Sequence, residues 1–171
     1  MVGDRAARVG ALRAAPATEL YRVDDLVGFL AGSWRIDREY RDGGGHLIGA
    51  MTGTGHYTPD TSGLRYTERG TLNSAGYRGE GERRYRLIAQ TASRAAIRFE
   101  DGRPFHMLDL SSGRAEVLHL CGDDRYGGSY RAFGLGRWTL RWVVSGPRKE
   151  YAIESEYTRA IIAGQPVSSA L

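Results

Sequence analysis

Hydrophobic and polar residues alternate along most of the chain from Trp34 onward, and short glycine-rich turns interrupt the alternation. The clearest case is residues 137–144, where apolar side chains occupy every second position and arginine or threonine the positions between. Successive side chains of a β-strand point to opposite faces of its sheet. This stretch therefore predicts a strand that turns Trp138, Leu140, Trp142 and Val144 toward a core.

Similar runs recur along the chain and predict strands near 33–41, 46–57, 64–73, 77–88, 94–99, 104–110, 114–121, 126–133, 137–144 and 150–160. The links between them are short and rich in turn residues, so they join antiparallel neighbours and leave no room for a helical crossover. Ten such strands expose two long edges unless the sheet closes on itself. The sequence thus predicts an all-β fold, a single closed or nearly closed up-and-down antiparallel barrel of about ten strands.

A short helix is expected before the first strand and should cap one end of the barrel. Residues 22–31 carry apolar side chains spaced for one helical face, with Asp24 and Asp25 in the first turn and Gly32 as the stop. We expect residues 1–18 to form a mobile basic leader, 19–161 the barrel domain, and 162–171 a frayed tail.

Charge and composition exclude several classes of partner. The net charge is +4, and residues 1–18 contribute +2 of it (three arginines against one aspartate), which leaves +2 for the rest. Arginines alternate with glutamates along the strands, which is typical of a solvated face and unlike the one-signed patch that binds nucleic acid. No apolar run is long enough to span a membrane, and the single cysteine excludes an internal disulfide. We expect a cytoplasmic protein without nucleic-acid or membrane partners.

The segment Gly32-Ser33-Trp34, which follows the short apolar helix, resembles the Gly-x-Trp signature of the lipocalin-like (calycin) barrels. In that superfamily an arginine near the end of the last strand packs over the tryptophan, and Arg159 is the fitting residue here. Ten up-and-down strands also bring the last strand back beside the first. The resemblance implies structural roles for Gly32, Trp34 and Arg159, with the cation stacked on the indole ring.

Four further segments, at 104–106, 119–121, 126–130 and 146–151, resemble an uncharacterised domain-of-unknown-function branch of these barrels. The resemblance covers about residues 29–160 and implies a fold without implying an activity. Haem binding of the nitrobindin kind would need a histidine late in the chain, and none follows His119. We expect no cofactor.

Strand direction predicts where the polar and aromatic side chains gather. Inward residues that come late in odd-numbered strands or early in even-numbered ones lie at the end opposite Trp34, which we call the mouth. They are Arg38, Tyr40, Tyr77, His119, Cys121, Tyr126, Trp142 and Tyr151, and the loops there add Asp123, Asp124, Arg148 and Lys149. Barrel mouths are common ligand sites.

This grouping suggests acid–base chemistry on a small organic ligand. His119 would be the general acid or base, Tyr126 and Tyr151 would hold ligand oxygens, and Arg38 would stabilise developing negative charge. Such a site predicts a cofactor-independent isomerase, cyclase or lyase. The alternative for His119 is a buried histidine that is hydrogen-bonded to a tyrosine.

Further ligand-binding candidates are Tyr40, His106, Cys121, Tyr130, Trp142, Lys149 and Tyr151. The alternative for the tyrosines is a packing role, and both interpretations stay open. Cys121 suits a small buried hydrophobe better than a nucleophile. His119 and Cys121 with His106 form a conceivable zinc set, but no second ligand pair supports it, and we expect no metal. The facing of His106 and of strand 46–57, where either Met51 or Thr52 points inward, is open.

Three charged residues are predicted to face inward, and buried charges must be paired. Pairing strands 64–73 and 77–88 through the turn at 73–76 sets Tyr66 opposite Arg83, with Glu68 one step away. The simple interpretation is an internal salt bridge. The sharper one is an arginine that awaits a ligand carboxylate or enolate oxygen, for which Arg38, nearer the mouth, is the better candidate.

Two other functions are compatible with the same sequence, because barrels of this kind host both carriers and enzymes. One is a non-catalytic carrier or sensor of a small hydrophobic or aromatic ligand. The other is a protein-interaction module, which a filled interior would favour. A homodimer is also possible.

Overall fold

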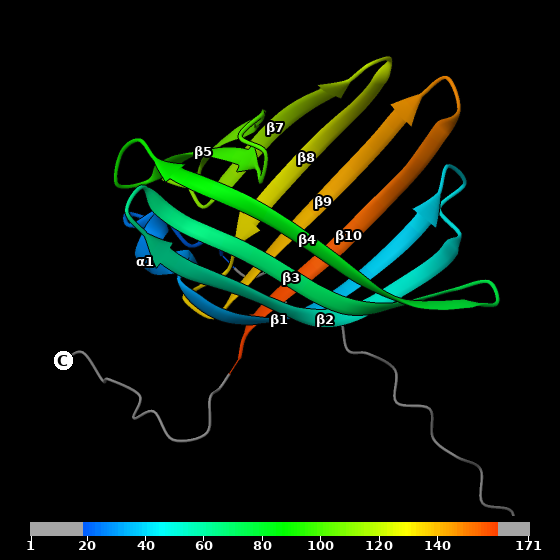
Figure 1. The fold of residues 1–171 in the computed structure, drawn as a ribbon, viewed down its shortest axis with the longest axis horizontal. Coiled ribbons are helices and arrows are strands. Elements are labelled where there is room, and N and C mark those ends of the chain that lie inside the picture. The colour runs from blue at the N-terminus through cyan, green and yellow to red at the C-terminus, as the bar shows by residue number, and fades with distance from the viewer. Residues whose placement is uncertain (1–18, 161–171) are drawn as a thin grey trace, which may run out of the picture.

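The computed structural model describes residues 19–160 and shows one short helix followed by ten antiparallel strands (Figure 1). The elements are α1 Leu26–Leu30, β1 Gly32–Asp42, β2 Leu47–Asp60, β3 Gly63–Ser74, β4 Tyr77–Ala89, β5 Arg94–Phe99, β6 Pro104–Asp109, β7 Arg114–Cys121, β8 Asp124–Ala132, β9 Arg137–Gly146 and β10 Lys149–Arg159. All ten predicted strands are confirmed, with ends that differ by at most three residues. The predicted leader 1–18 and tail 162–171 lie outside the described residues.

The strands form one sheet in the order β6-β5-β4-β3-β2-β1-β10-β9-β8-β7. Chain neighbours pair throughout except β6 and β7, and β1 pairs with β10. The edge strands β6 and β7 lie side by side, but the described chain forms no backbone ladder between them. The predicted up-and-down barrel is therefore confirmed as nearly closed.

Side chains form hydrogen bonds across the seam between β6 and the β7–β8 hairpin. His119 on β7 donates from Nδ1 to the Phe105 carbonyl on β6, 3.1 Å away. His106 on β6 meets the Tyr130 hydroxyl on β8, with 2.9 Å between Nε2 and the oxygen. The facing of His106, which the sequence left open, is inward, since His106 is buried.

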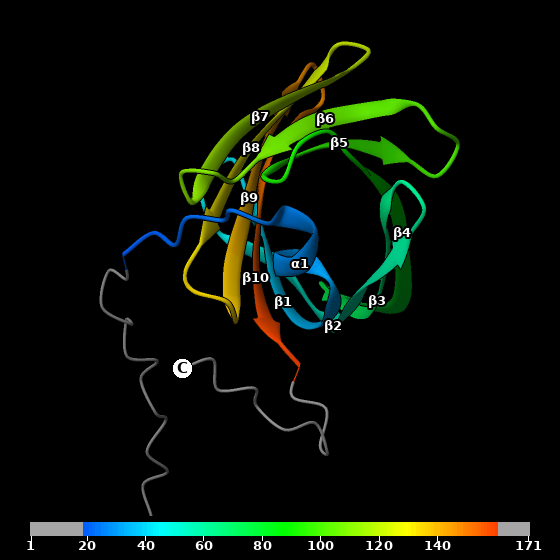
Figure 2. The same ribbon diagram turned by 90° about the vertical axis from the view of Figure 1, so that its left-hand side faces the viewer.

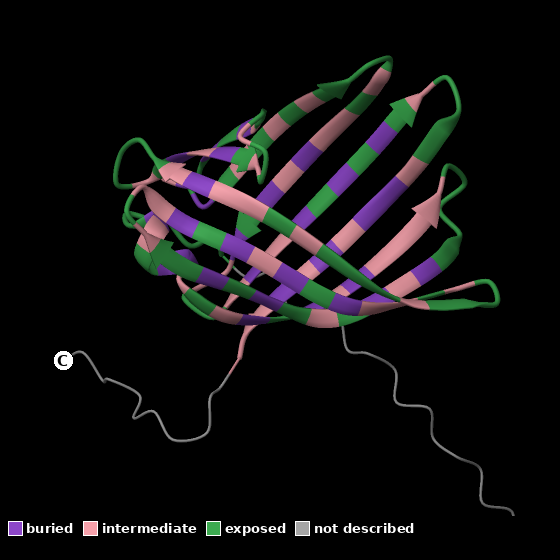
Figure 3. Cartoon of the chain, in the orientation of Figure 1, coloured by how far each residue is buried: buried purple, intermediate pink, exposed green. Residues whose placement is uncertain are grey.

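The barrel wall is incomplete beside the first part of β4. β4 pairs with the short strand β5 only from Tyr85 to Ala89. The preceding stretch, 77–84, has no strand beside it on that side within the described residues, and its side chains are exposed or half-buried (Figure 3). The barrel is therefore closed near α1 and opens toward the hairpin tips at the other end.

The closed end is built on Trp34, and α1 lies across it (Figure 2). Trp34 is fully buried and donates from Nε1 to the Leu30 carbonyl at 2.8 Å. The Arg159 guanidinium lies 4.2 Å from the centre of the indole ring. It also donates to the carbonyls of Phe29, Ala31 and Leu135 at 2.6, 2.8 and 3.1 Å. The predicted arginine–tryptophan seal is confirmed.

The helix is shorter than the apolar spacing predicted. Asp25 is its N-cap and accepts from the Gly28 amide at 2.9 Å, so neither Asp24 nor Asp25 lies in the first turn, as was predicted for both. The segment before it is held differently, because Val23 donates its amide to the Leu110 carbonyl at 3.1 Å instead of joining a helix. Gly32 begins β1 with a φ of 107°, a conformation that favours glycine, and does not itself end the helix.

Side-chain alternation and strand register can now be compared with the predictions. The inward faces predicted for β1, β3, β9 and β10 are confirmed, and on β2 Met51 is buried while Thr52 is exposed. The predicted register of β3 and β4 was wrong by two residues, because the turn between them contains only Ala75 and Gly76. Glu68 therefore lies opposite Arg83, and Tyr66 lies opposite Tyr85. A shift of two residues keeps every side chain on its predicted face.

Candidate ligand-binding cavity

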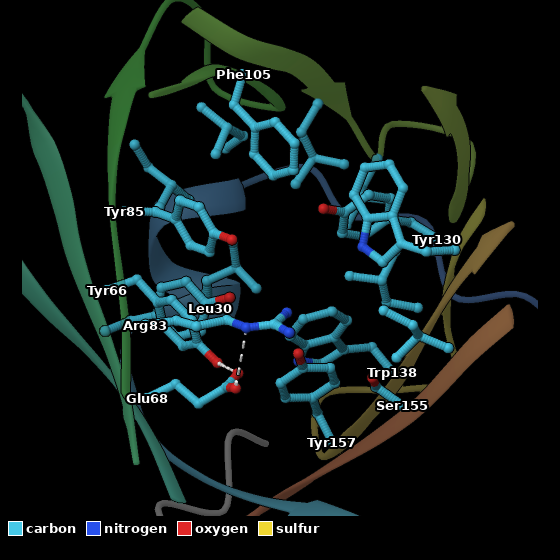
Figure 4. Close-up of a pocket in the computed structure, with 18 of the residues that line it drawn as sticks. Leu30, Tyr66, Glu68, Arg83, Tyr85, Phe105, Tyr130, Trp138, Ser155 and Tyr157 are labelled. Atoms are coloured by element: carbon cyan, nitrogen blue, oxygen red, sulfur yellow. Dashed lines mark hydrogen bonds and ion pairs between the residues drawn. The ribbon is translucent and has the colours of Figure 1, made fainter. Parts of the chain in front are cut away.

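A cavity occupies the barrel interior and is bordered by 19 residues (Figure 4). The cavity volume is about 50 Å³, within about 670 Å³ of empty space that includes the part open to solvent. The interior is therefore narrow and suits a flat or slender molecule. Eight lining residues are aromatic: Tyr57, Tyr66, Tyr85, Phe105, Tyr130, Trp138, Trp142 and Tyr157.

The aromatic rings follow one another around the wall. Tyr85 stacks on Phe105 with ring centres 5.3 Å apart and planes within 14°, and Phe105 stacks on Trp142 at 5.4 Å and 24°. The inner face of β9, which carries Trp142, also carries Trp138, and the Trp138 ring stacks on Tyr157 of β10 at 3.7 Å and 3°. Alternate inward positions of neighbouring strands bring these rings together. They give the cavity broad apolar surfaces with hydroxyl groups at their edges.

A buried ion pair crosses the interior between β1 and β3. Arg38 and Glu68 form a two-pronged pair, with Nη1–Oε1 at 2.6 Å and Nη2–Oε2 at 2.8 Å, and their side chains are 2% and 3% exposed. Arg38 also donates to Ser155 Oγ at 2.8 Å and to the Tyr157 hydroxyl at 3.0 Å. Tyr66 donates to Glu68 Oε2 at 2.7 Å.

Both members of this pair keep their charge. Burial opposes the charge of Arg38, but Tyr157 and Glu68 offset it and raise the pKa of Arg38 above its ordinary value. Burial would likewise raise the pKa of Glu68, but the hydrogen bonds and charge of Arg38, aided by Tyr66, lower it. The predicted internal salt bridge exists, and its arginine is Arg38.

Arg83 is the second arginine that faces inward, from β4. Its Nε lies 4.0 Å from Glu68 Oε1, beyond hydrogen-bonding distance, and its side chain is 38% exposed. Figure 4 shows the side chain reaching from the wall into the cavity above Glu68. Arg83 thus lies where the cavity meets solvent, beside the unpaired stretch of β4.

The phenols that line the cavity remain protonated near neutral pH. Burial raises the pKa of Tyr57, Tyr66 and Tyr130 well above the ordinary value. Burial also raises the pKa of Tyr85, against the opposing charge of Arg83. Each hydroxyl can therefore act as a hydrogen-bond donor.

Two buried nitrogens near these rings have no hydrogen-bond partner within residues 19–160. One is Nε1 of Trp138, which can only donate, and the other is Nδ1 of His106. Burial, and then the neighbouring His119, lower the pKa of His106 to about 4. His106 is therefore a neutral imidazole, and its ring lies nearly parallel to those of Phe105 and Trp142, with centres 4.5 and 5.6 Å away.

The three residues predicted to act together are not grouped around the cavity. His119 is half-buried behind Phe105, with ring centres 4.8 Å apart, and is not among the lining residues. Tyr126 lies near it, at 6.1 Å between ring centres. Arg38 instead contacts Glu68 and the side chains around that pair. The alternative interpretation of His119 was a bond to a tyrosine, but the bond is to a backbone carbonyl.

The predicted ligand-binding residues separate into a group inside the barrel and a group at the hairpin tips. Tyr130 and Trp142 line the cavity, while Tyr40 and Tyr151 are half-buried and pack against the core. The second group lies at the hairpin tips. There Lys149 pairs with Asp124 at 2.5 Å and reaches the Tyr126 hydroxyl at 3.3 Å, and Cys121 is exposed rather than buried.

Sequence reasoning missed the position of Arg83 and the roles of Trp138, Tyr85 and Tyr157 as cavity walls. The signal was present in the lengths of the predicted strands. The run 94–99 is half as long as the run 77–88 before it. An inward arginine that precedes the paired part of the longer run therefore has no strand beside it on that side.

Two further findings concern metal ligands and membrane-spanning helices. In the part of the chain that the structure describes, no three His, Cys, Asp or Glu side chains are grouped so as to hold a metal ion. No helix within residues 19–160 is long and apolar enough to cross a membrane.

Comparison with known proteins agrees with this fold. No curated protein sequence matches the chain. The S-type phycobiliprotein lyase CPES from Guillardia theta has a similar structure, with a TM-score of 0.59 and 10% identity over 83% of this chain and 94% of that one. A DUF3598 protein of unknown function from Nostoc punctiforme is similar with a TM-score of 0.54 and 11% identity, over 86% of this chain and 53% of that one. At these identities the likeness shows the fold alone.

A family model covers most of the barrel. It matches residues 30–159, from the last residue of α1 to the end of β10. The matched region includes every residue named above as lining the cavity. The chain belongs to the family of unknown function DUF6314.

Proposed function

We propose that this chain is a calycin-like barrel that binds a small, flat organic molecule inside the barrel, as a carrier or sensor. The observation that carries the proposal is the cavity lined by two sets of stacked rings, Tyr85–Phe105–Trp142 and Trp138–Tyr157. Concave, mostly apolar sites with a few fixed polar groups are typical of small-molecule binding. A protein-interaction module would not need this interior space.

The protonation states favour binding over catalysis. An efficient general acid or base has a pKa near the working pH. The cavity instead holds phenols whose pKa burial raises, an ion pair that keeps both charges, and a neutral His106. Such groups recognise a ligand through fixed donors and charges.

A proton-transfer enzyme is the second candidate, and His106 is the observation that favours it. Its Nδ1 is buried without a partner in the described chain, and its ring stacks on two cavity-lining residues. In this version His106, rather than His119, would move the proton. Deuterium uptake into a bound ligand that is lost in His106→Gln would support it.

Binding is best tested with a matched pair of leucine variants. Leu140→Trp places an indole in the cavity lining, whereas Leu120→Trp places one on the exposed outer face of β7. One- and two-ring aromatic compounds, neutral and acidic, would be screened by saturation-transfer NMR. We expect the wild type and Leu120→Trp to bind the same compounds and Leu140→Trp to lose them, with Leu140→Phe as a milder variant. A wild type that binds none of the panel, or binding that survives both cavity variants, would overturn the proposal.

A further inference from the structure

We infer that the ligand carries an anionic group, a carboxylate in the simplest case, and that Arg83 binds it. This inference rests on the proposed function, because it names the chemical class of molecule that the cavity receives. The sequence favoured Arg38 as the arginine that binds a ligand carboxylate, and we now assign this role to Arg83.

The charges inside the cavity do not cancel. Arg38 and Glu68 neutralise one another through two short hydrogen bonds, and both are almost fully buried. Arg83 adds a second positive charge to the same lining. The cavity therefore carries one positive charge in excess, and a ligand with one negative charge would balance it.

The donors of the two arginines are used very differently. Arg38 donates from Nε to Ser155, from Nη1 to Glu68, and from Nη2 to both Glu68 and Tyr157. The nearest carboxylate oxygen to Arg83 Nε is 4.0 Å away and is already bound by Arg38. Within residues 19–160 no carboxylate or carbonyl accepts a hydrogen bond from Arg83, so its guanidinium has N–H groups for a carboxylate, which it can hold at two points.

The surroundings of Arg83 fit such a ligand. Tyr85 lines the cavity beside Arg83, whose charge and hydrogen bond act against the burial-driven rise in the pKa of Tyr85. Tyr85 begins the stacked series that continues through Phe105 to Trp142. A carboxylate at Arg83 would place an attached aromatic ring against these faces. The inferred class is therefore an aromatic or conjugated carboxylic acid of one or two rings.

The exposure of Arg83 gives the binding direction. Its side chain is 38% exposed, whereas those of Arg38 and Glu68 are at most 3% exposed. A charged group can therefore reach Arg83 while it keeps part of its hydration, and the apolar part of the ligand enters the drier interior. This division lowers the cost of bringing an anion to the barrel.

The test compares 2-naphthoate with its neutral analogue 2-naphthamide by isothermal titration of the full-length protein. Three proteins are used: the wild type, Arg83→Gln, and Arg84→Gln. Arg84 is the matched control, because it follows Arg83 on β4 but faces solvent and pairs with Glu82 and Glu100. We expect Arg83→Gln to weaken naphthoate binding about 10- to 100-fold and to leave naphthamide binding unchanged. Arg84→Gln should change neither.

Each other outcome has a distinct meaning. If naphthoate and naphthamide bind the wild type equally, or if Arg83→Gln and Arg84→Gln behave alike, the anion inference fails and cavity binding stands. If neither probe binds the wild type, the proposed function itself fails along with the inference. Circular dichroism confirms folding, and Arg83→Lys, which keeps the charge without the fork, should give an intermediate affinity.

Discussion

The two ends of the barrel each hold an inward arginine among aromatic rings, and the contrast between them separates stability from function. At the closed end, Arg159 stacks on Trp34 and donates to three carbonyls. Toward the mouth, Arg83 has one carboxylate oxygen at 4.0 Å. The first arginine is satisfied by hydrogen bonds to the backbone, and the second has donors that no carboxylate or carbonyl of residues 19–160 binds.

The Arg38–Glu68 pair lies between these extremes. It is as buried as the closed end and fully hydrogen-bonded, yet it borders the cavity. Its removal should therefore affect stability first and binding only as a consequence. The contrast predicts a graded series of effects on the free energy of unfolding.

The largest effect should come from Glu68→Gln. The change leaves the buried Arg38 charge without its counter-ion, which typically costs about 3–5 kcal/mol. Urea unfolding followed by circular dichroism measures it. The control is Glu82→Gln, which removes a partner of Arg69 on the surface and should cost far less, because solvent screens an exposed pair. Equal losses in both variants would show that the buried pair contributes no more than a surface one.

Arg159→Met should come next, with a loss of about 2–3 kcal/mol. The substitution keeps much of the apolar contact with Trp34 but removes the three hydrogen bonds that join β10 to the segment before β1 and to Leu135. Ligand affinity should stay unchanged because Arg159 does not line the cavity. A variant that unfolds like the wild type, or that binds more weakly while equally stable, would contradict the separation of the two ends.

His106 should make stability depend on pH. Its pKa is lowered to about 4 in the folded state from an ordinary value of 6.5, so the unfolded chain binds the proton more readily. Stability is therefore full above about pH 6.5 and falls as the pH drops toward 4, by about 2 kcal/mol between pH 7.5 and pH 5. Urea unfolding at both values should show the loss in the wild type and little of it in His106→Gln. His46→Gln, at an exposed turn, should keep the wild-type dependence.

Arg83→Gln should have the smallest effect on stability, below about 1 kcal/mol, because its ion pair is long and half-exposed. Thermal unfolding checks this value. A large loss would mean that Arg83 serves the fold in the way Arg38 does. A small loss together with weakened naphthoate binding would sharpen the contrast between the two ends.

The sequence was sufficient to predict the fold because alternation and turns act locally. The apolar positions of 137–144 and the short links between strands determine which faces point inward and which strands are neighbours. The position of Arg159 over Trp34 followed from the number of strands and the resemblance to calycin barrels.

The site was harder to predict, because it depends on where the wall stops. His119 joins β7 to β6 and His106 joins β6 to Tyr130 on β8, and no local pattern reveals these contacts across the seam. The β3–β4 turn is two residues long, which sets Arg83 opposite Glu68. Glu68 nevertheless forms its short ion pair with Arg38. Both arginines face inward in either register, so the alternation could not show which one keeps free donors.

The most direct test of ligand binding in the interior is a set of intermolecular NOEs between 2-naphthoate and the protein. We expect contacts from the naphthalene protons to the rings of Tyr85, Phe105 and Trp142, and a chemical-shift change at the Arg83 side chain. NOEs confined to the outer face, for example to Leu118 or Leu120, would contradict the proposal that the barrel interior receives the ligand.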